Sequence, residues 1–217
     1  MIQEYYEFPE RVFITGTDTG VGKTVISAIL MAGLRGIYWK PVQSGLDDVT
    51  DREWVQEKTG LPDTHFRPET YRLKLPISPH ASAKREGVRI DLEKFQIPEV
   101  ESPDHLIIEG AGGIMVPLNE GCLMRDLMKK TDSQIILVTR TSLGTINHTL
   151  LSLAELERQD LRVMAVVMNG PKDTVSKQAI EYYGKVRVLA EIEPLPDINP
   201  VSLKTMFDKY FQSTKEG

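Results

Sequence analysis

Short apolar runs recur along the chain, and they constrain its fold more than any other feature of the sequence. They lie at residues 12–15, 37–40, 105–109, 134–139, 162–168 and 186–190. Several of them, such as QIILVT, are apolar at both odd and even positions, which is typical of strands covered on both faces of a sheet. Helical patterning separates most of the runs. The alternation predicts an α/β fold of three layers, with a mostly parallel central sheet flanked by helices.

Two stretches show the spacing of an amphipathic helix, and the second of them lies near the end of the chain. The apolar residues that define them are Ile146, Leu150, Leu153 and Ala154 in the first, and Leu203, Met206, Phe207 and Tyr210 in the second. By contrast, residues 61–79 carry four prolines and little periodicity. We interpret this segment as a long ordered loop, which in a compact domain is more often functional than idle.

Length and composition set further limits. With 217 residues, 41% of them hydrophobic, and no linker or repeat, the chain is expected to form a single domain over residues 1–217. No apolar run approaches the ~18 residues of a membrane span, and the start has no apolar signal region. The single cysteine, Cys122, favours a reducing compartment, so we expect a cytoplasmic protein. A net charge of −5 with scattered Lys and Arg argues against nucleic-acid or membrane partners.

Polar residues end several of the predicted strands. They are Thr15-Gly16, Lys40, Glu109-Gly110, Thr139-Arg140 and Asn169-Gly170. In an open parallel sheet, ligands bind beyond the carboxyl ends of the strands. We therefore expect these residues to lie around one site.

A glycine-rich segment follows the first predicted strand and precedes an apolar helical stretch. It reads GTDTGVGKT over residues 16–24. Glycines let successive backbone N–H groups face one centre, and the helix N-terminus adds partial positive charge, so the segment is typical of a phosphate site. Lys23 is expected to reach the β- and γ-phosphates and the Thr24 hydroxyl to bind Mg²⁺. The usual pattern has glycine at position 17; this chain has Thr17, with Gly16 one place earlier.

Two carboxylates are candidate magnesium ligands. Glu109 precedes a second glycine cluster, where phosphate-binding proteins of this type keep an acidic residue. Asp51 opens a predicted helix, and one or two carboxylates plus phosphate oxygens are the usual ligands of Mg²⁺. The structural alternatives are a solvated strand end for Glu109 and a helix cap for Asp51, a role that Thr50 could also fill. For Lys40 the alternative is an exposed lysine at a strand end.

Five segments together resemble the dethiobiotin synthetases of biotin biosynthesis. They are GTDTGVGKT, WKPVQSG, EGAGGIMVPL, LGTINH and VVMN, in the family's order, and the resemblance spans residues 11–196. It implies a homodimeric enzyme with a P-loop NTPase-like fold. Such an enzyme uses ATP, Mg²⁺ and CO₂ to close a cyclic urea on 7,8-diaminononanoate. It would be an ATP-dependent cyclo-ligase that forms carbon–nitrogen bonds and releases ADP and phosphate.

The resemblance also implies roles for individual residues. Lys23 and Lys40 would be catalytic, and Thr24, Asp51 and Glu109 would ligate magnesium. The nucleotide would be bound by Gly20, Val21, Gly22, Lys23, Thr24, Val25, Asp51, Glu109, Gly110, Ala111, Gly112, Asn169, Gly170, Glu193, Pro194 and Leu195. Some relatives carry Asp at the position of Gly170, so the base contact here is expected to rest on Asn169.

The substrate is expected to contact two parts of the dimer. Thr17 and Ser44 would bind its reacting end. Its carboxylate tail would reach Gly144, Thr145 and Asn147 of a second copy, at a helix start that is a ready anion site. The same helix could bury part of its apolar stripe against its symmetry mate.

Two other functions are compatible with a phosphate loop in an α/β fold. A partition or septum-positioning switch ATPase would carry a signature lysine five residues before Lys23, where this chain has Asp18. A cobyrinate-type amide synthetase would add a glutamine-hydrolysing domain, for which the chain has no length. Phosphate release that depends on the diamine would separate all three.

Overall fold

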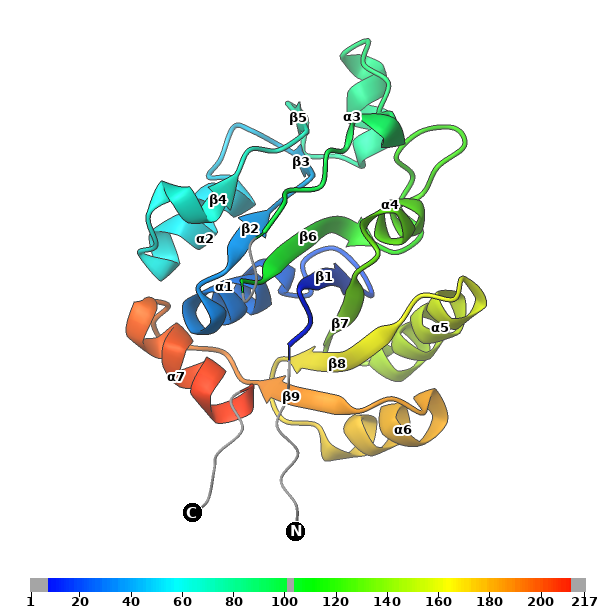
Figure 1. Cartoon of the computed structure of the whole chain (residues 1–217). Helices are drawn as coiled ribbons and strands as arrows, with labels where there is room; N and C mark the ends of the chain where they lie inside the picture. Colours follow the sequence, from blue (N-terminus) through cyan, green and yellow to red (C-terminus); the bar gives the residue numbers. More distant parts are fainter. Residues whose placement is uncertain (1–7, 101–103, 212–217) are drawn as a thin grey trace.

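Seven strands form one central sheet, and each neighbouring pair within it is parallel. The computed structural model describes residues 8–100 and 104–211. The start of the chain, where no signal peptide is expected, lies mostly outside the described residues. The strand order is β4-β2-β6-β1-β7-β8-β9 (Figure 1). The bounds are β1 Arg11–Gly16, β2 Ile37–Trp39, β4 Phe66–Arg67, β6 Leu106–Gly113, β7 Gln134–Arg140, β8 Val163–Asn169 and β9 Val188–Ile192.

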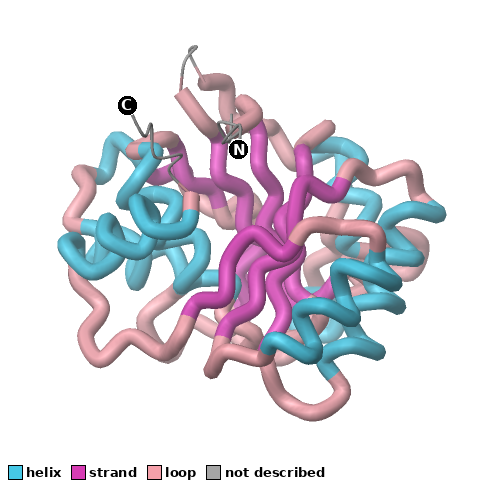
Figure 2. Tube along the Cα trace, turned by 90° about the horizontal axis from the view of Figure 1, so that it is seen from below, coloured by secondary structure: helices cyan, strands magenta, loops and turns pink. Residues whose placement is uncertain are grey.

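Helices cover both faces of this sheet, as Figure 2 shows from below. The α-helices are α1 Lys23–Leu34, α2 Asp51–Thr59, α3 Pro79–Arg85, α4 Met124–Thr131, α5 Thr145–Arg158, α6 Thr174–Gly184 and α7 Pro200–Tyr210, and two 3₁₀ turns span Asp63–His65 and Leu92–Lys94. One face packs on α1, α2 and α7, and the other on α4, α5 and α6. The three-layer α/β fold is therefore confirmed.

The proline-rich segment 61–79 is more structured than the sequence suggests. It contains β4 and β5, the latter at Tyr71–Leu73, and β5 pairs in parallel with β3 (Val42–Ser44) in a separate two-stranded sheet. The prediction of a long loop was wrong for these residues, because strands of two or three residues are too short to show a period. The end of the segment, at residues 76–79, does reach the cavity described below.

The buried face of α5 also differs from the apolar stripe predicted for it. Ala154 is exposed, whereas Thr145 and Thr149 are buried. Both threonine hydroxyls are hydrogen-bonded to Thr139 Oγ1, at 2.8 and 3.0 Å. Satisfied hydroxyls can therefore occupy core positions that a hydrophobic pattern assigns to apolar residues. The apolar pattern of α7 is confirmed, since Leu203 and Phe207 are buried there.

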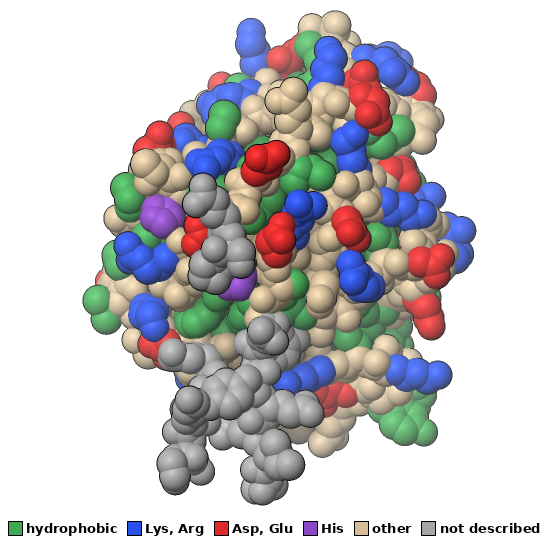
Figure 3. All heavy atoms as spheres, in the orientation of Figure 1, with side chains coloured by type: hydrophobic (Ala, Val, Ile, Leu, Met, Phe, Trp, Pro, Cys, Tyr) green, Lys and Arg blue, Asp and Glu red, His purple; other side chains and the backbone are tan. Residues whose placement is uncertain are grey.

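The surface mixes charges of both signs. Lys and Arg side chains are interspersed with Asp and Glu over the face shown in Figure 3. Within residues 8–100 and 104–211, the helices are too short or too polar to cross a membrane.

Register in the sheet brings the polar strand ends together. Ile14 of β1 lies opposite Glu109 of β6, and Trp39, the last residue of β2, lies opposite Ile108. Lys40 therefore follows directly beside Glu109. The phosphate loop leaves the end of β1 at the same edge, so one site receives residues from three neighbouring strands.

Candidate active site

The glycine-rich segment forms a tight loop between β1 and α1. Gly22 caps α1 with a φ of 99°, and a Cβ there would come 2.1 Å from Asn169 Nδ2. A Cβ on Gly16 would come 2.6 Å from a methyl carbon of Val21. This close approach explains the departure from the usual pattern, because the loop needs its first glycine at position 16 and has room for a side chain at Thr17. The Lys23 ammonium folds back and donates to the Asp18 carbonyl at 3.1 Å.

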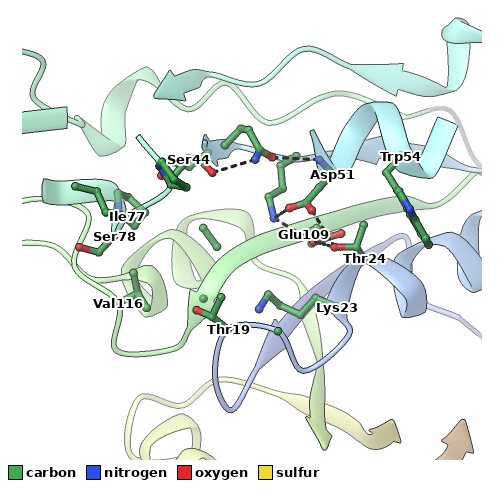
Figure 4. Close-up of a pocket in the computed structure, with 18 of the residues that line it drawn as sticks. Thr19, Lys23, Thr24, Ser44, Asp51, Trp54, Ile77, Ser78, Glu109 and Val116 are labelled. Atoms are coloured by element: carbon green, nitrogen blue, oxygen red, sulfur yellow. Dashed lines mark hydrogen bonds and ion pairs between the residues drawn. The ribbon is translucent and has the colours of Figure 1, made fainter. Parts of the chain in front are cut away.

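Three oxygen-bearing side chains meet beside this loop. The Thr24 hydroxyl lies 3.1 Å from Asp51 Oδ1 and 3.0 Å from Glu109 Oε1. Lys40 Nζ bridges the same two carboxylates, at 2.5 Å from Asp51 Oδ2 and 3.0 Å from Glu109 Oε1, and also donates to the Gly110 carbonyl. Figure 4 shows the cluster at the centre of the cavity. The structure thus brings together all three predicted magnesium ligands and both predicted catalytic lysines.

The local structure explains how Asp51 is free to point into the cluster. Thr50 is the N-cap of α2, and it forms a capping box with Glu53. Asp51 is the first residue of the helix and does not cap it. The capping alternative for Asp51 is therefore wrong, and its carboxylate can face Lys40.

The structural alternatives for Glu109 and Lys40 are wrong as well. Glu109 is 1% exposed and Lys40 is 3% exposed, so neither is a solvated strand end. An ammonium and a carboxylate are buried only when each has partners, and here the two groups partner each other.

The two lysines differ in their electrostatic surroundings. Burial, followed by the nearby positive charge of Lys40, lowers the pKa of Lys23 to about 8. Burial also acts to lower the pKa of Lys40, but the carboxylates of Glu109 and Asp51 together outweigh it and raise this pKa. The pKa of Asp51 is lowered because the Lys40 ammonium outweighs the cost of burial. Lys40 is therefore held as a cation.

A cavity of about 680 Å³ opens over this cluster. Its walls include a polar group and an apolar group of side chains. The polar and loop residues are Thr19, Gly20, Gly22, Lys23, Thr24, Lys40, Gln43, Ser44, Asp51, Ser78, Glu109 and Gly112, and the others are Val25, Val42, Val49, Trp54, Pro76, Ile77, Pro79, Ala111 and Val116. Ser44 Oγ is buried and has no hydrogen-bond partner among the described residues. An unpaired buried hydroxyl in a cavity wall is a group that a ligand can satisfy.

Several predicted nucleotide residues lie outside this cavity but close to the loop. The Asn169 side-chain amide donates to the Val21 carbonyl at 3.0 Å. The Gly170 amide donates to the Ile192 carbonyl, which places it beside the start of residues 193–195. Val21 itself is buried, and Gly110 contributes its carbonyl to Lys40. The nucleotide roles of these residues remain predictions.

The predicted substrate residues divide into two groups. Ser44 lines the cavity, whereas Thr17 lies at the start of the loop, with its hydroxyl directed to Thr139 Oγ1 at 3.4 Å. Gly144, Thr145 and Asn147 lie at the start of α5, away from the cavity lining. Of these, Asn147 is exposed and the Thr145 hydroxyl is bonded to Thr139. Their roles remain predictions.

Sequence reasoning missed two polar groups and the apolar wall. Tyr38 donates to Glu109 Oε2 at 3.0 Å, and Gln43, in the cavity wall, accepts from the Asp51 amide at 3.4 Å. The strand period offered a signal for Tyr38, because it lies two residues before Lys40 and so on the same face of the sheet. The apolar wall had no such signal, since its residues are scattered between positions 25 and 116 of the chain.

Comparison with known proteins agrees with this geometry. A family model described as an AAA domain matches residues 10–202. The ATP-dependent dethiobiotin synthetase BioD of Paramagnetospirillum magneticum is 48% identical over 192 residues, which cover 88% of this chain and 92% of that protein. Proteins of the same name from Agrobacterium fabrum and Rhodopseudomonas palustris (strain BisA53) are 44% and 43% identical; each match covers 93% of this chain, and 94% and 93% of those proteins.

Solved structures resemble the chain in fold alone. The MinC:MinD cell division protein complex of Aquifex aeolicus matches with a TM-score of 0.52 and 17% identity, covering 91% of this chain and 89% of that one. A ParA family ATPase from Chlorobium tepidum matches with a TM-score of 0.52 and 12% identity, covering 93% of each chain. These matches support the P-loop NTPase-like fold. The matching sequences, by contrast, are 43% to 48% identical over 88% to 93% of this chain. By these matches the chain belongs to the ATP-dependent dethiobiotin synthetase family.

Proposed function

We propose that this chain synthesises dethiobiotin from 7,8-diaminononanoate, CO₂ and ATP; the names of its relatives give the product and the use of ATP. The observation that carries the proposal is that Lys23, Lys40 and two carboxylates line one cavity beside a phosphate loop. The reaction joins two amines through one carbon atom, forms carbon–nitrogen bonds and releases ADP and phosphate.

The chemistry requires charge neutralisation more than a strong base. One amine and CO₂ form a carbamate, whose oxygen is already a negative nucleophile. It attacks the γ-phosphoryl group of ATP, and the resulting carbamic–phosphoric anhydride is attacked by the second amine as phosphate leaves. Phosphoryl transfer of this kind depends on positioning and on cations at the transferred group. Lys23 and Lys40 are the cations that this chain supplies.

The residues of the cavity also fit Mg²⁺. Thr24, Asp51 and Glu109 supply a hydroxyl and two carboxylates, which are hard oxygen donors, and the Lys40 ammonium already occupies a cation position between the carboxylates. Mg²⁺ usually takes one or two carboxylates together with phosphate oxygens and water. When bound, it would neutralise phosphate charge. Because all three side chains offer oxygen donors, the set suits Mg²⁺ better than a transition metal that prefers nitrogen or sulfur ligands.

The cavity supports a substrate with amines at one end and a hydrocarbon chain. Ser44 Oγ, with no partner of its own, is available to an amine or carbamate. Val42, Ile77 and Val116 offer apolar contacts to a methylene chain. The phosphate loop, the residues 109–112 and the neighbouring Asn169, Gly170 and 193–195 would bind the nucleotide.

We further propose a homodimer in which α5 of one copy completes the site of the other. The start of α5 offers Gly144 and Asn147, both exposed, and the first-turn amides of a helix favour an anion such as the substrate carboxylate. The Thr145 hydroxyl is bonded to Thr139 and its backbone amide to the Ser142 carbonyl at 3.1 Å, so a contact from Thr145 would require one of these bonds to be exchanged.

The test is phosphate release from ATP in the presence of Mg²⁺ and bicarbonate, with and without 7,8-diaminononanoate. We expect release to depend on the diamine and to be matched by dethiobiotin formed. Lys40→Gln is expected to lower this rate by about 100-fold or more while an ATP analogue still binds. ATP hydrolysis at the same rate without the diamine would contradict the proposal and favour a switch ATPase.

A further inference from the structure

The two oxygens of the Glu109 carboxylate have different partners. Oε2 accepts a hydrogen bond from the Tyr38 hydroxyl at 3.0 Å. Oε1 faces the other way and lies 3.0 Å from both Lys40 Nζ and the Thr24 hydroxyl. Only Oε1 is therefore directed toward the cluster in which the metal is proposed to bind.

Tyr38 is held rigidly in this position. It is fully buried in β2, where it lies opposite Ile107 in register and packs against the Phe66 ring. Glu109 is two residues after Ile107 on the same strand, so its side chain emerges on the same face of the sheet as that of Tyr38. The position of the phenol is thus fixed by the sheet, and its hydroxyl holds Oε2 of Glu109 by a hydrogen bond.

We propose that Tyr38 is a positioning residue that restricts Glu109 to one ligating oxygen and so favours Mg²⁺ over Ca²⁺ at this site. The inference rests on the proposed magnesium site. Ca²⁺ takes six to eight oxygens and often binds a carboxylate through both, whereas Mg²⁺ demands six at fixed geometry and takes carboxylates through one. A carboxylate whose second oxygen is occupied by a buried phenol suits the smaller ion. Hydrogen-bond partners of metal ligands commonly contribute 10- to 100-fold to metal affinity.

The experiment measures binding of the β,γ-imido analogue of ATP by calorimetry, in EDTA, in Mg²⁺ and in Ca²⁺. For each metal, the ratio of the analogue's dissociation constant in EDTA to that in the metal gives the tightening due to that metal. The tightening by Mg²⁺ divided by the tightening by Ca²⁺ gives the preference between the two metals. We expect Tyr38→Phe to reduce the tightening by Mg²⁺ about 10-fold and that by Ca²⁺ less than about 2-fold. Affinity in EDTA should be unchanged.

Tyr71→Phe is the matched control. Tyr71 is also a buried tyrosine, and its hydroxyl accepts from the Asp91 amide at 2.9 Å, outside the cavity lining. This variant also loses a buried hydrogen bond, but it should keep the wild-type preference between the metals. In a Glu109→Gln background, Tyr38→Phe should have no further effect on the metals, because Tyr38 acts through the carboxylate.

Each alternative outcome identifies what fails. If Mg²⁺ tightens binding to the wild type and to Tyr38→Phe equally, Tyr38 has no role in the preference, while the magnesium site stands. If Mg²⁺ does not tighten binding to the wild type at all, the magnesium site fails and this inference with it. Should Tyr38→Phe fail to fold, a crystal structure of the wild type with Mg²⁺ and the analogue decides. One Glu109 oxygen on the metal with the Tyr38 bond retained supports the proposal, and two oxygens overturn it.

Discussion

Lys23 and Lys40 illustrate at the scale of single residues how one cavity can hold two cations in different ways. Lys40 is balanced by two carboxylates, whereas the Lys23 ammonium rests on a backbone carbonyl. The lowered pKa of Lys23, caused first by burial, means that the folded protein disfavours its charge. A phosphate group would supply the anion that Lys23 lacks.

Lys23→Ala is therefore expected to reduce diamine-dependent phosphate release by about 100-fold or more, because an electrostatic contact to the transferred group is lost. The melting temperature should stay the same or rise slightly, since a poorly compensated buried charge is removed. Coupled phosphate assays and thermal unfolding check the two parts. Lys94→Ala, at an exposed lysine with no role in the site, is the control. Wild-type turnover in Lys23→Ala would rule out the phosphate-loop role.

At the scale of elements, the start of α2 links stability to the site. Thr50 Oγ1 accepts from the Glu53 amide, and Glu53 Oε2 accepts from the Thr50 amide at 2.9 Å. Thr50→Ala is expected to lower the free energy of unfolding by about 1 kcal/mol, the usual effect of losing a cap, and Thr50→Ser to retain most of it. Urea denaturation measures both variants. Equal stability of Thr50→Ala and the wild type would show that the capping box contributes nothing measurable.

A second element-level contact joins α5 to α4. Glu155 forms ion pairs with Arg125 and Arg158, and hydrogen bonding to Arg158, followed by the charges of both arginines, lowers its pKa to about 2 despite an opposing effect of desolvation. A lowered pKa in the folded state stabilises the protein above the unfolded pKa of about 4.3, and this contribution is lost as the pH falls toward 2. Glu155→Gln should therefore lower the melting temperature at pH 7. The difference from the wild type should shrink progressively below pH ~4.5. A difference that is constant from pH 7 to pH 3.5 would contradict this assignment.

At the scale of the whole molecule, the proposed homodimer predicts that exposed apolar residues of α5 are covered by a second copy. Leu151 is 63% exposed on this helix. Leu151→Asp should place a charge in the interface and weaken the dimer by about 10-fold or more, which light scattering across a dilution series would detect. Ring closure should fall with the dimer, while binding of the ATP analogue persists.

Val201→Asp provides the control for that experiment, since Val201 is 75% exposed on α7, on the other face of the sheet. It should leave both the mass and the activity unchanged. A wild-type protein that is monomeric at assay concentrations and fully active would refute the shared site, but it would leave the ATP chemistry intact.

The sequence by itself determined the layered α/β fold and the phosphate loop. Both depend on local rules. Strands covered on both faces are apolar at successive positions, and GKT between a strand and a helix is a motif of a few consecutive residues. The same locality explains the errors. Strands as short as β4 and β5 have no period to detect, and the buried threonines of α5 are acceptable in the core only because Thr139, on another strand, bonds to them.

The tertiary structure alone decided which polar residues share the site. Thr24, Asp51 and Glu109 lie on α1, α2 and β6, far apart in the chain, and nothing local to Asp51 distinguishes a helix cap from a group facing Lys40. The parallel register of β2 beside β6 decided both the burial of Lys40 and the contact between Tyr38 and Glu109. Such contacts are made through space between strands, so their partners follow from how the sheet is assembled, and no single segment of sequence carries that information.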